Sequence, residues 1–248
     1  MEKPTLIISD LHLEESRPEL TSAFLDFVEK SKNHCSRLFI LGDLFEAWIG
    51  DDDDSALADS VARQLNALAA TGVEIGLMHG NRDFLLGEQY AARCGARLME
   101  ESEIITSGSD RFLLMHGDSL CTDDVSYQAF RTMVRQPEWQ AQFLSQSLED
   151  RRAFATQART QSKIESAAKN NDIMDVNANA VASALTAAGV TQLIHGHTHR
   201  PASHQLKLLD EAGEQSVVAT RTVLGDWGAT GWQIKLQGNK LSLIEFNI

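Results

Sequence analysis

The sequence predicts an α/β fold with an inserted helical segment, and three observations support this prediction. Short apolar runs typical of buried strands alternate with stretches of helical periodicity along most of the chain. The range 126–169 has helical spacing and no strand pattern. The 248 residues, 43% of them hydrophobic, suit one large domain better than two complete ones. We therefore expect a core formed by 1–125 and 170–248, with a helical cap inserted at 126–169.

The predicted strands are the apolar runs 5–9, 37–41, 73–78, 111–115 and 191–194. Between the first three of them, 21–32 and 55–70 repeat apolar residues at helical spacing, and Ser55 is the expected N-cap of the second helix. The four aspartates at 51–54 lack the spacing and the distant glutamate of an EF-hand calcium loop. We expect them to form a solvated loop that leads into this helix.

The pattern changes towards the end of the chain. The short segments 216–224, 231–236 and 240–246 are separated by turn signals, which is typical of an antiparallel meander.

The insertion 126–169 is both aromatic and basic. Its aromatic residues recur at helical spacing, as Tyr127, Phe130, Trp139 and Phe143 show. The segment contains seven basic and four acidic residues. Composition alone suits a helical hairpin packed on the core. The position of the insertion between chemical motifs favours a cap that covers a substrate, and we expect the cap.

Composition excludes several classes of protein. A formal net charge of -13 argues against broad affinity for nucleic acid or anionic lipid. The three cysteines form neither an even set nor a CxxC pair, so neither a disulfide framework nor a zinc knuckle is indicated. The apolar runs are too short to span a bilayer, and the N-terminal segment lacks the features of a secretory signal. We expect a cytoplasmic protein without an obligate protein partner.

Each predicted core strand is followed by side chains that can bind metal. They are Asp10 and His12, Asp43, Asn81, His116, and His197 with His199. In an open α/β fold the carboxyl ends of the strands border the ligand crevice, so these side chains can converge. Carboxylate, amide oxygen and imidazole suit manganese, iron or zinc, and seven ligands suit two metals sharing a carboxylate better than one closed zinc site. We predict two divalent metal ions, with Mn²⁺ as the first choice.

Five short motifs contain these side chains. In chain order they are Asp-x-His with Asp10, Gly-Asp with Asp43, Gly-Asn-x-Asp with Asn81, a lone His at His116, and Gly-His-x-His with His197. In that order the sequence resembles the calcineurin-like metallophosphoesterase superfamily, which implies a two-sheet sandwich flanked by helices. By that resemblance one metal is bound by Asp10, His12, Asp43 and His199, and the other by Asp43, Asn81, His116 and His197. Asp43 would then bridge the two metals.

Three further residues near these motifs have other expected roles. His195 lies outside the superfamily pattern, and we expect it to be a packed histidine. Asp83 and Asp118 are expected to orient ligands such as Asn81 and His116.

Arg82 stands where many members of this superfamily carry histidine after the motif asparagine. Histidine can protonate an alcohol leaving group, whereas a leaving phosphate monoester needs little protonation. Arginine cannot act as an acid, but its guanidinium can hold phosphate oxygens. Arginine at this position therefore predicts cleavage of a pyrophosphate bond. The residues that we expect to act in catalysis are Asp43, Asn81, Arg82 and His116.

Longer motifs at 9–13, 80–84, 116–124, 173–177 and 195–201 are more specific. In them the chain resembles the pyrophosphohydrolases that cleave UDP-2,3-diacylglucosamine in lipid A synthesis. The resemblance implies attack at the uridine-side phosphorus, giving UMP and 2,3-diacylglucosamine 1-phosphate, and a cap that receives the acyl chains. The substrate contacts it implies are Asn81, Arg82, Asp124, Ser162, Ser166, Lys169 and His197, with Ser166 replacing an expected asparagine.

A substrate with two acyl tails implies a peripheral visit to the cytoplasmic face of the inner membrane, with apolar residues and arginines of the cap in contact. Two alternatives remain. The protein could be a dinuclear-metal hydrolase of a soluble dinucleotide or nucleotide diester, or a scaffold of the same fold without catalysis. Preference for an acylated over a deacylated sugar nucleotide separates the first alternative from the lipid substrate.

Overall fold

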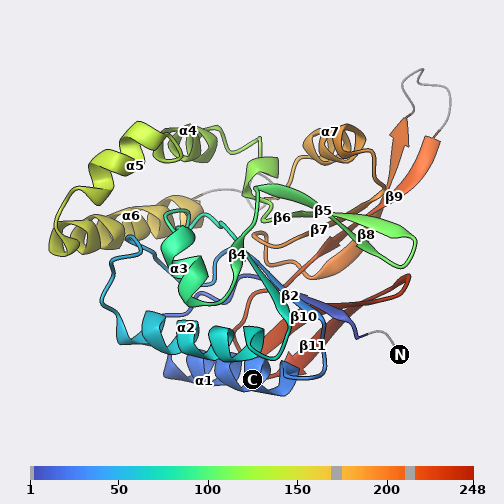
Figure 1. The fold of residues 1–248 in the computed structure, drawn as a ribbon. Coiled ribbons are helices and arrows are strands. Elements are labelled where there is room, and N and C mark those ends of the chain that lie inside the picture. The colour runs from blue at the N-terminus through green and yellow to red at the C-terminus, as the bar shows by residue number, and fades with distance from the viewer. Residues whose placement is uncertain (1–2, 169–174, 210–215) are drawn as a thin grey trace.

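The computed structural model describes residues 3–168, 175–209 and 216–248. Two β-sheets are stacked face to face, and helices cover their outer faces (Figure 1). The arrangement is the two-sheet sandwich flanked by helices that the resemblance implied.

The first sheet consists of β1 (Thr5–Ile8), β2 (Arg37–Leu41), β3 (Glu74–Met78), β4 (Arg97–Leu98), β10 (Thr230–Gln237) and β11 (Lys240–Asn247). The second consists of β5 (Ser102–Ser107), β6 (Asp110–Met115), β7 (Gln192–His195), β8 (Ala202–Leu209) and β9 (Ser216–Val223). Their strand orders are β11-β10-β1-β2-β3-β4 and β5-β6-β7-β9-β8. The helices are α1 (Pro18–Ser31), α2 (Ala56–Ala69), α3 (Glu88–Arg93), α4 (Val125–Val134), α5 (Pro137–Leu144), α6 (Leu148–Ala168) and α7 (Ala178–Ala188), with a 3₁₀ turn at Asp118–Leu120.

The central strands are apolar on both faces because each face packs against a different layer. Ile7 and Phe39 belong to the apolar cluster between the sheets, which also includes Ile194 of β7. The next residue of β1, Ile8, belongs instead to the cluster with Phe24 of α1. Successive strand side chains point to opposite faces, so a strand covered on both sides reads as a continuous apolar run. This confirms the five core strands predicted from such runs.

Helix α2 begins where the sequence predicted. The side chain of Ser55 accepts a hydrogen bond from the backbone N–H of Ala58 at 3.3 Å, which satisfies one of the free donors of the first turn. Cys35, Cys94 and Cys121 are buried free thiols. Among the residues that the structure describes, no helix is long and apolar enough to cross a membrane.

The predicted terminal meander is wrong in one of its three strands. β10 and β11 form an antiparallel hairpin, and β10 pairs with β1. β9, however, lies in the second sheet, where it pairs parallel with β7 and antiparallel with β8. The prediction failed because β8 was not recognised as a strand, and β9 was therefore assigned to the wrong neighbours.

The stretch without strand signals is helical, as its spacing predicted, and consists of α4, α5 and α6. Its arginines form ion pairs with carboxylates of the core. The pairs are Arg131 with Asp118, Arg151 with Asp52, Arg152 with Asp53 and Arg159 with Glu46. These described arginines therefore fasten the helices of the segment to an acidic core.

The aspartate run 51–54 forms a loop that leads into α2, as expected, and its carboxylates also take part in this attachment. Asp52 lies 2.5 Å from Arg151, and Asp53 lies 2.8 Å from Arg152. Asp51 accepts hydrogen bonds from the backbone N–H groups of Gly87 and Tyr90 at the start of α3. The loop therefore joins two helices to the core.

Candidate metal centre and substrate cavity

The structure brings the predicted metal ligands together at one edge of the sandwich. Asp10, Asp43 and Asn81 follow β1, β2 and β3 of the first sheet, while His116 and His197 follow β6 and β7 of the second. These neighbouring strands are parallel within each sheet, so their carboxyl ends lie at a common edge. Among the described residues, two groups have ligand atoms within 4.8 Å of one another: Asp10, His12 and His199, and Asp10, Asp43 and His116.

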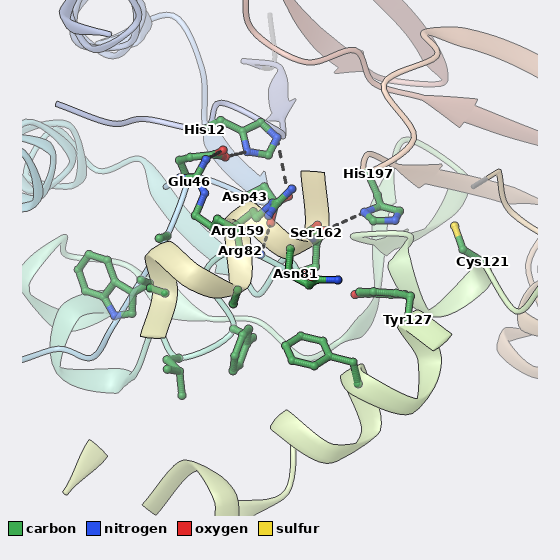
Figure 2. A pocket seen from close by; sticks show the side chains of 18 of the residues that line it. His12, Asp43, Glu46, Asn81, Arg82, Cys121, Tyr127, Arg159, Ser162 and His197 are labelled. Carbon is green, nitrogen blue, oxygen red and sulfur yellow. Dashed lines mark hydrogen bonds and ion pairs between the residues drawn. The ribbon is translucent and has the colours of Figure 1, made fainter. Parts of the chain in front are cut away.

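Asp43 lies at the centre of this cluster, next to imidazoles from both sheets. Its Oδ2 is 3.8 Å from Nε2 of His12 and 3.7 Å from Nε2 of His116. Figure 2 shows Asp43 between His12 and the Asn81 side of the cluster. Burial raises the pKa of Asp43, and nearby Asp83 and Asp10 add to the rise, although His116 and His12 oppose it. Ionising this carboxyl is therefore costly unless additional positive charge is present.

Asn81 joins the two histidines of the second sheet. Its Oδ1 lies 3.0 Å from Nε2 of His116 and 2.8 Å from Nδ1 of His197. Burial lowers the pKa of His197 to about 3, and the neighbouring His116 contributes to this shift. His197 is therefore a neutral imidazole near neutral pH, which is the form that binds metal.

Asp10 lies beside His199 on the other side. Its Oδ1 is 3.4 Å from Nε2 of His199, and its carboxylate also accepts hydrogen bonds from Ser9 Oγ and the backbone N–H of His197. Burial opposes ionisation of Asp10, but the contact with His199 and the charges of the other histidines outweigh it and hold the pKa below its usual range. Asp10 is therefore ionised and available as a ligand.

Five of the seven predicted ligands have a backbone conformation that non-glycine residues rarely adopt. Their φ angles are 56° at Asp10, 50° at His12, 52° at Asp43, 65° at His197 and 53° at His199. Such left-handed residues cost roughly 1–3 kcal/mol each and concentrate at functional sites. The loops after the strands therefore place these side chains at the expense of local backbone stability.

Two motif glycines are required by close approach to the cluster. A Cβ at Gly80 would collide with Oδ1 and the backbone nitrogen of Asp43, and one at Gly196 would collide with the carboxylate of Asp10. Both glycines allow loops from different strands to meet directly against buried carboxylates.

The orienting contacts differ in part from those expected. Nδ1 of His116 lies 2.8 Å from the carbonyl oxygen of Leu41, so a backbone group orients this ring instead of Asp118. Asp118 accepts hydrogen bonds from the hydroxyl of Tyr127 and from Nε of Arg131 on α4. Its role is to attach α4 beside the cluster.

Asp83 also acts differently from the expectation. Its carboxylate accepts hydrogen bonds from the backbone N–H groups of Leu44 and Gly80, both at 2.8 Å. It therefore joins the loops after β2 and β3 and does not bind the Asn81 side chain. His195 is fully buried, and its Nδ1 lies 2.8 Å from the carbonyl oxygen of Gly196, which confirms it as a packed histidine.

A cavity of about 670 Å³ opens on the cluster and extends beneath α4, α5 and α6. One end is lined by polar side chains around Asp43, and the rest largely by aromatic and small apolar side chains. The aromatic lining consists of Trp48, Phe84, Tyr127, Phe130, Trp139, Phe143 and Phe154. Cavities of this size and mixed character are typical of sites for small organic ligands.

Five predicted substrate contacts line this cavity: Asn81, Arg82, Asp124, Ser162 and His197. Asp124 also accepts a hydrogen bond from the backbone N–H of Tyr127 and so caps α4. The side chain of Ser166 and all of Lys169 lie outside the described residues.

Three buried polar atoms in the cavity wall have no hydrogen-bond partner among the described residues. They are Nε of Arg82, Nε of Arg159 and Oγ1 of Thr198. A buried donor without a partner costs about 1–3 kcal/mol, and arginine is well suited to bind phosphate oxygens. The polar end of the cavity is therefore prepared for an anionic group next to the carboxylate and imidazole cluster.

Glu46, Tyr127 and Arg159 line the cavity, although the sequence did not single them out as site residues. Glu46 lies only three positions after Asp43 but matches no ligand motif, and Arg159 was counted only within the basic insertion. Their roles depend on contacts between segments distant in sequence, and residue spacing does not show such contacts.

Comparison with known proteins agrees with this geometry. The calcineurin-like phosphoesterase family matches residues 3–201. A curated protein named UDP-2,3-diacylglucosamine hydrolase from Cellvibrio japonicus is 51% identical, over 98% of this chain and 99% of its own length. A protein of the same name from Marinobacter nauticus is 48% identical, over 95% of this chain and 94% of its own.

Among solved structures, an archaeal phosphodiesterase aligns over 99% of each chain with 12% identity and a TM-score of 0.47. The family match spans every predicted metal ligand, from Asp10 to His199. The chain therefore belongs to the calcineurin-like phosphoesterase family, in the group whose curated relatives are named UDP-2,3-diacylglucosamine hydrolases.

Proposed function

We propose that this protein hydrolyses the pyrophosphate bond of UDP-2,3-diacylglucosamine, giving UMP and 2,3-diacylglucosamine 1-phosphate for lipid A synthesis. The observation that carries the proposal is the cavity, which joins a carboxylate and imidazole cluster to an aromatic chamber. The relatives of that name, similar over nearly their full length, support the same substrate.

The cluster fits two divalent cations, for which we propose Mn²⁺. Its donors are two carboxylates, four imidazoles and one amide oxygen, which suit this ion. The proposed sets are Asp10, His12, Asp43 and His199 for one ion and Asp43, Asn81, His116 and His197 for the other. When bound, the two ions make hydroxide available near neutral pH and neutralise charge on the phosphoryl oxygens.

The remaining polar residues bind and orient the pyrophosphate. Arg82 lies beside Asn81, and its buried Nε, unpaired among the described residues, can donate to a phosphate oxygen. An arginine here stabilises the departing phosphate monoester, which needs no proton from the enzyme. Ser162 lies in the same wall, and we propose that it, Asp124 and the segment with Ser166 and Lys169 contact the sugar phosphate.

We propose that the segment 126–169 is a cap that receives the acyl chains. Phe130, Trp139, Phe143 and Phe154 come from its helices and line the cavity. Trp139 stacks on Phe143 at 5.0 Å between ring centroids, and Phe143 contacts Phe154 edge-on at 5.2 Å. These rings provide an apolar wall opposite the polar end.

A lipid substrate also suggests where the protein works. We propose that it acts at the cytoplasmic face of the inner membrane as a peripheral protein. Val125, the first residue of α4, is 75% exposed, and Ile164 of the cap is 61% exposed, so apolar surface is available for contact with lipid.

The site of attack is tested by running the reaction in oxygen-18 water. Attack at the uridine-side phosphorus places the label in UMP, because that phosphorus gains the oxygen from water. Mass spectrometry of both products reads the outcome. Label in 2,3-diacylglucosamine 1-phosphate instead would contradict the proposed orientation of the substrate.

A further inference from the structure

Glu46 contacts the metal-ligand cluster with one carboxylate oxygen and the cap with the other. Its Oε2 lies 2.7 Å from Nδ1 of His12. Its Oε1 accepts a hydrogen bond from Nη2 of Arg159, which belongs to α6. Figure 2 shows the three side chains together at one side of the cavity. A single carboxylate therefore connects a proposed metal ligand to a helix of the inserted segment.

The contact with Glu46 sets which nitrogen of His12 faces the cluster. With Nδ1 held by Glu46, Nε2 lies 3.8 Å from Oδ2 of Asp43 and 3.4 Å from Nε2 of His199. Histidines that bind metal commonly donate their other ring N–H to a carboxylate or carbonyl, which fixes the ring and its tautomer. Glu46 occupies this position for His12.

His116 shows why this arrangement differs from the rest of the cluster. Its Nδ1 is held by the backbone carbonyl of Leu41, the last residue of β2. A carbonyl at the end of a central strand keeps its place whatever α6 does. The carboxylate of Glu46, in contrast, is a flexible side chain whose second oxygen is held by the helix.

The Glu46 and Arg159 side chains are only 13% and 19% exposed, so their ion pair is more than a surface contact. Without Arg159, Oε1 of Glu46 would lose this charged partner beside the cavity. The carboxylate would then gain rotamers in which His12 is no longer held.

We propose that Glu46 is a positioning residue that couples the docking of α6 to metal binding at His12. When α6 is docked, Arg159 holds Glu46, Glu46 holds the His12 ring, and the metal site is complete. When α6 moves away, His12 loses its fixed orientation and metal binding weakens. This inference rests on the proposed metal centre and extends it.

Mn²⁺ binding to the chelator-treated full-length protein tests the proposal, measured without substrate by competition with a chromogenic chelator. Glu46→Ala should raise the half-saturating Mn²⁺ concentration by roughly 10–100-fold, as loss of such orienting partners does. Arg159→Ala should raise it by a smaller factor. In the Glu46→Ala background, Arg159→Ala should add nothing, because the two act through one contact.

Arg152→Ala is the matched control, since Arg152 also ties α6 to the core but pairs with Asp53 and Asp54. It should leave Mn²⁺ affinity unchanged. Glu46→Gln keeps an oxygen acceptor for His12 and should retain most of the affinity, with a melting temperature close to wild type. If Glu46→Ala folds poorly, the comparison of Arg159→Ala with Arg152→Ala carries the test.

Equal Mn²⁺ affinity in Glu46→Ala and wild type would overturn the proposal. So would equal shifts in Arg159→Ala and Arg152→Ala, because the contact between Arg159 and Glu46 would then have no effect of its own on metal binding. Absence of Mn²⁺ binding by the wild type would contradict the proposed metal centre itself, and the coupling with it.

Discussion

Asp43 destabilises the folded protein at the position where the proposed metal centre requires a carboxylate. It is 1% exposed, has a φ of 52° and lies near the carboxylates of Asp10 and Asp83. Burial raises its pKa, which means that the folded, metal-free protein resists the ionised form of this residue. Ionisable residues whose pKa is shifted by burial and nearby charges are typical of functional sites.

Replacing Asp43 with Asn should separate stability from activity. Because the folded pKa of Asp43 is raised, the ionised side chain destabilises the folded protein. This destabilisation is absent below the unfolded pKa of 3.8 and is complete once the pH has risen above the folded pKa. Asp43→Asn should therefore melt higher than wild type at pH 7 after chelation, and the difference should shrink towards pH 4.

In the same variant, metal-dependent turnover should fall by more than about 100-fold, because metal stabilisation of a transition state contributes several kcal/mol. Thermal melts across pH and a turnover assay measure the two effects. A lower melting temperature at pH 7, or retained turnover, would contradict the role given to Asp43.

Arg82→His would restore the residue common in the superfamily but should weaken pyrophosphate cleavage. A charge-assisted hydrogen bond to substrate contributes about 1.5–3 kcal/mol, so kcat/KM should fall roughly 10–100-fold. Steady-state kinetics on UDP-2,3-diacylglucosamine measure this, with Arg152→His as the control at an arginine outside the cavity. An unchanged kcat/KM for Arg82→His would refute the phosphate-binding role.

At the scale of elements, the helices and strands that the sequence predicted correctly are those that can be recognised from the apolar pattern of their own residues. The central strands were recognisable because burial on both faces gives a continuous apolar run, and α2 was recognisable because burial on one face gives a helical period. β9 was misplaced because its neighbours, β7 and β8, are chosen by the sheet and not by the local pattern.

The same distinction applies to the site. The predicted ligands Asp10, Asp43 and His197 meet because they follow parallel strands, a rule that can be applied to a sequence. Glu46 and Arg159 meet only because α6 docks over the loop after β2. The periodicity of the sequence does not predict how α6 docks, so the contact between these two residues could be identified only in the structure.

The exposed apolar residues of the cap should mediate contact with lipid. Introducing glutamate at Met133 and Ile164, which are 45% and 61% exposed, should reduce co-sedimentation with phospholipid vesicles, because charged side chains resist transfer into the interface. Val217 and Val218 of β9, 48% and 58% exposed, provide the control pair. Equal loss of binding in both double variants would contradict a specific role of the cap.

At the scale of the whole molecule, an acidic protein binds an anionic substrate through local cationic groups. The formal net charge is -13, yet the polar end of the cavity combines Arg82 and Arg159 with a cluster suited to divalent cations. Arginines of the inserted helices are largely engaged by core carboxylates. The overall charge therefore limits nonspecific binding, while the cavity supplies the attraction that the substrate requires.

The most direct test of this account is UMP release from UDP-2,3-diacylglucosamine in detergent micelles. The protein is first treated with a chelator, and manganese, magnesium or zinc is then added back. We expect chelation to abolish release and Mn²⁺ to restore it, with 2,3-diacylglucosamine 1-phosphate as the second product. Failure of every metal to restore release, while the same preparation cleaves a soluble nucleotide diester, would contradict the proposed substrate.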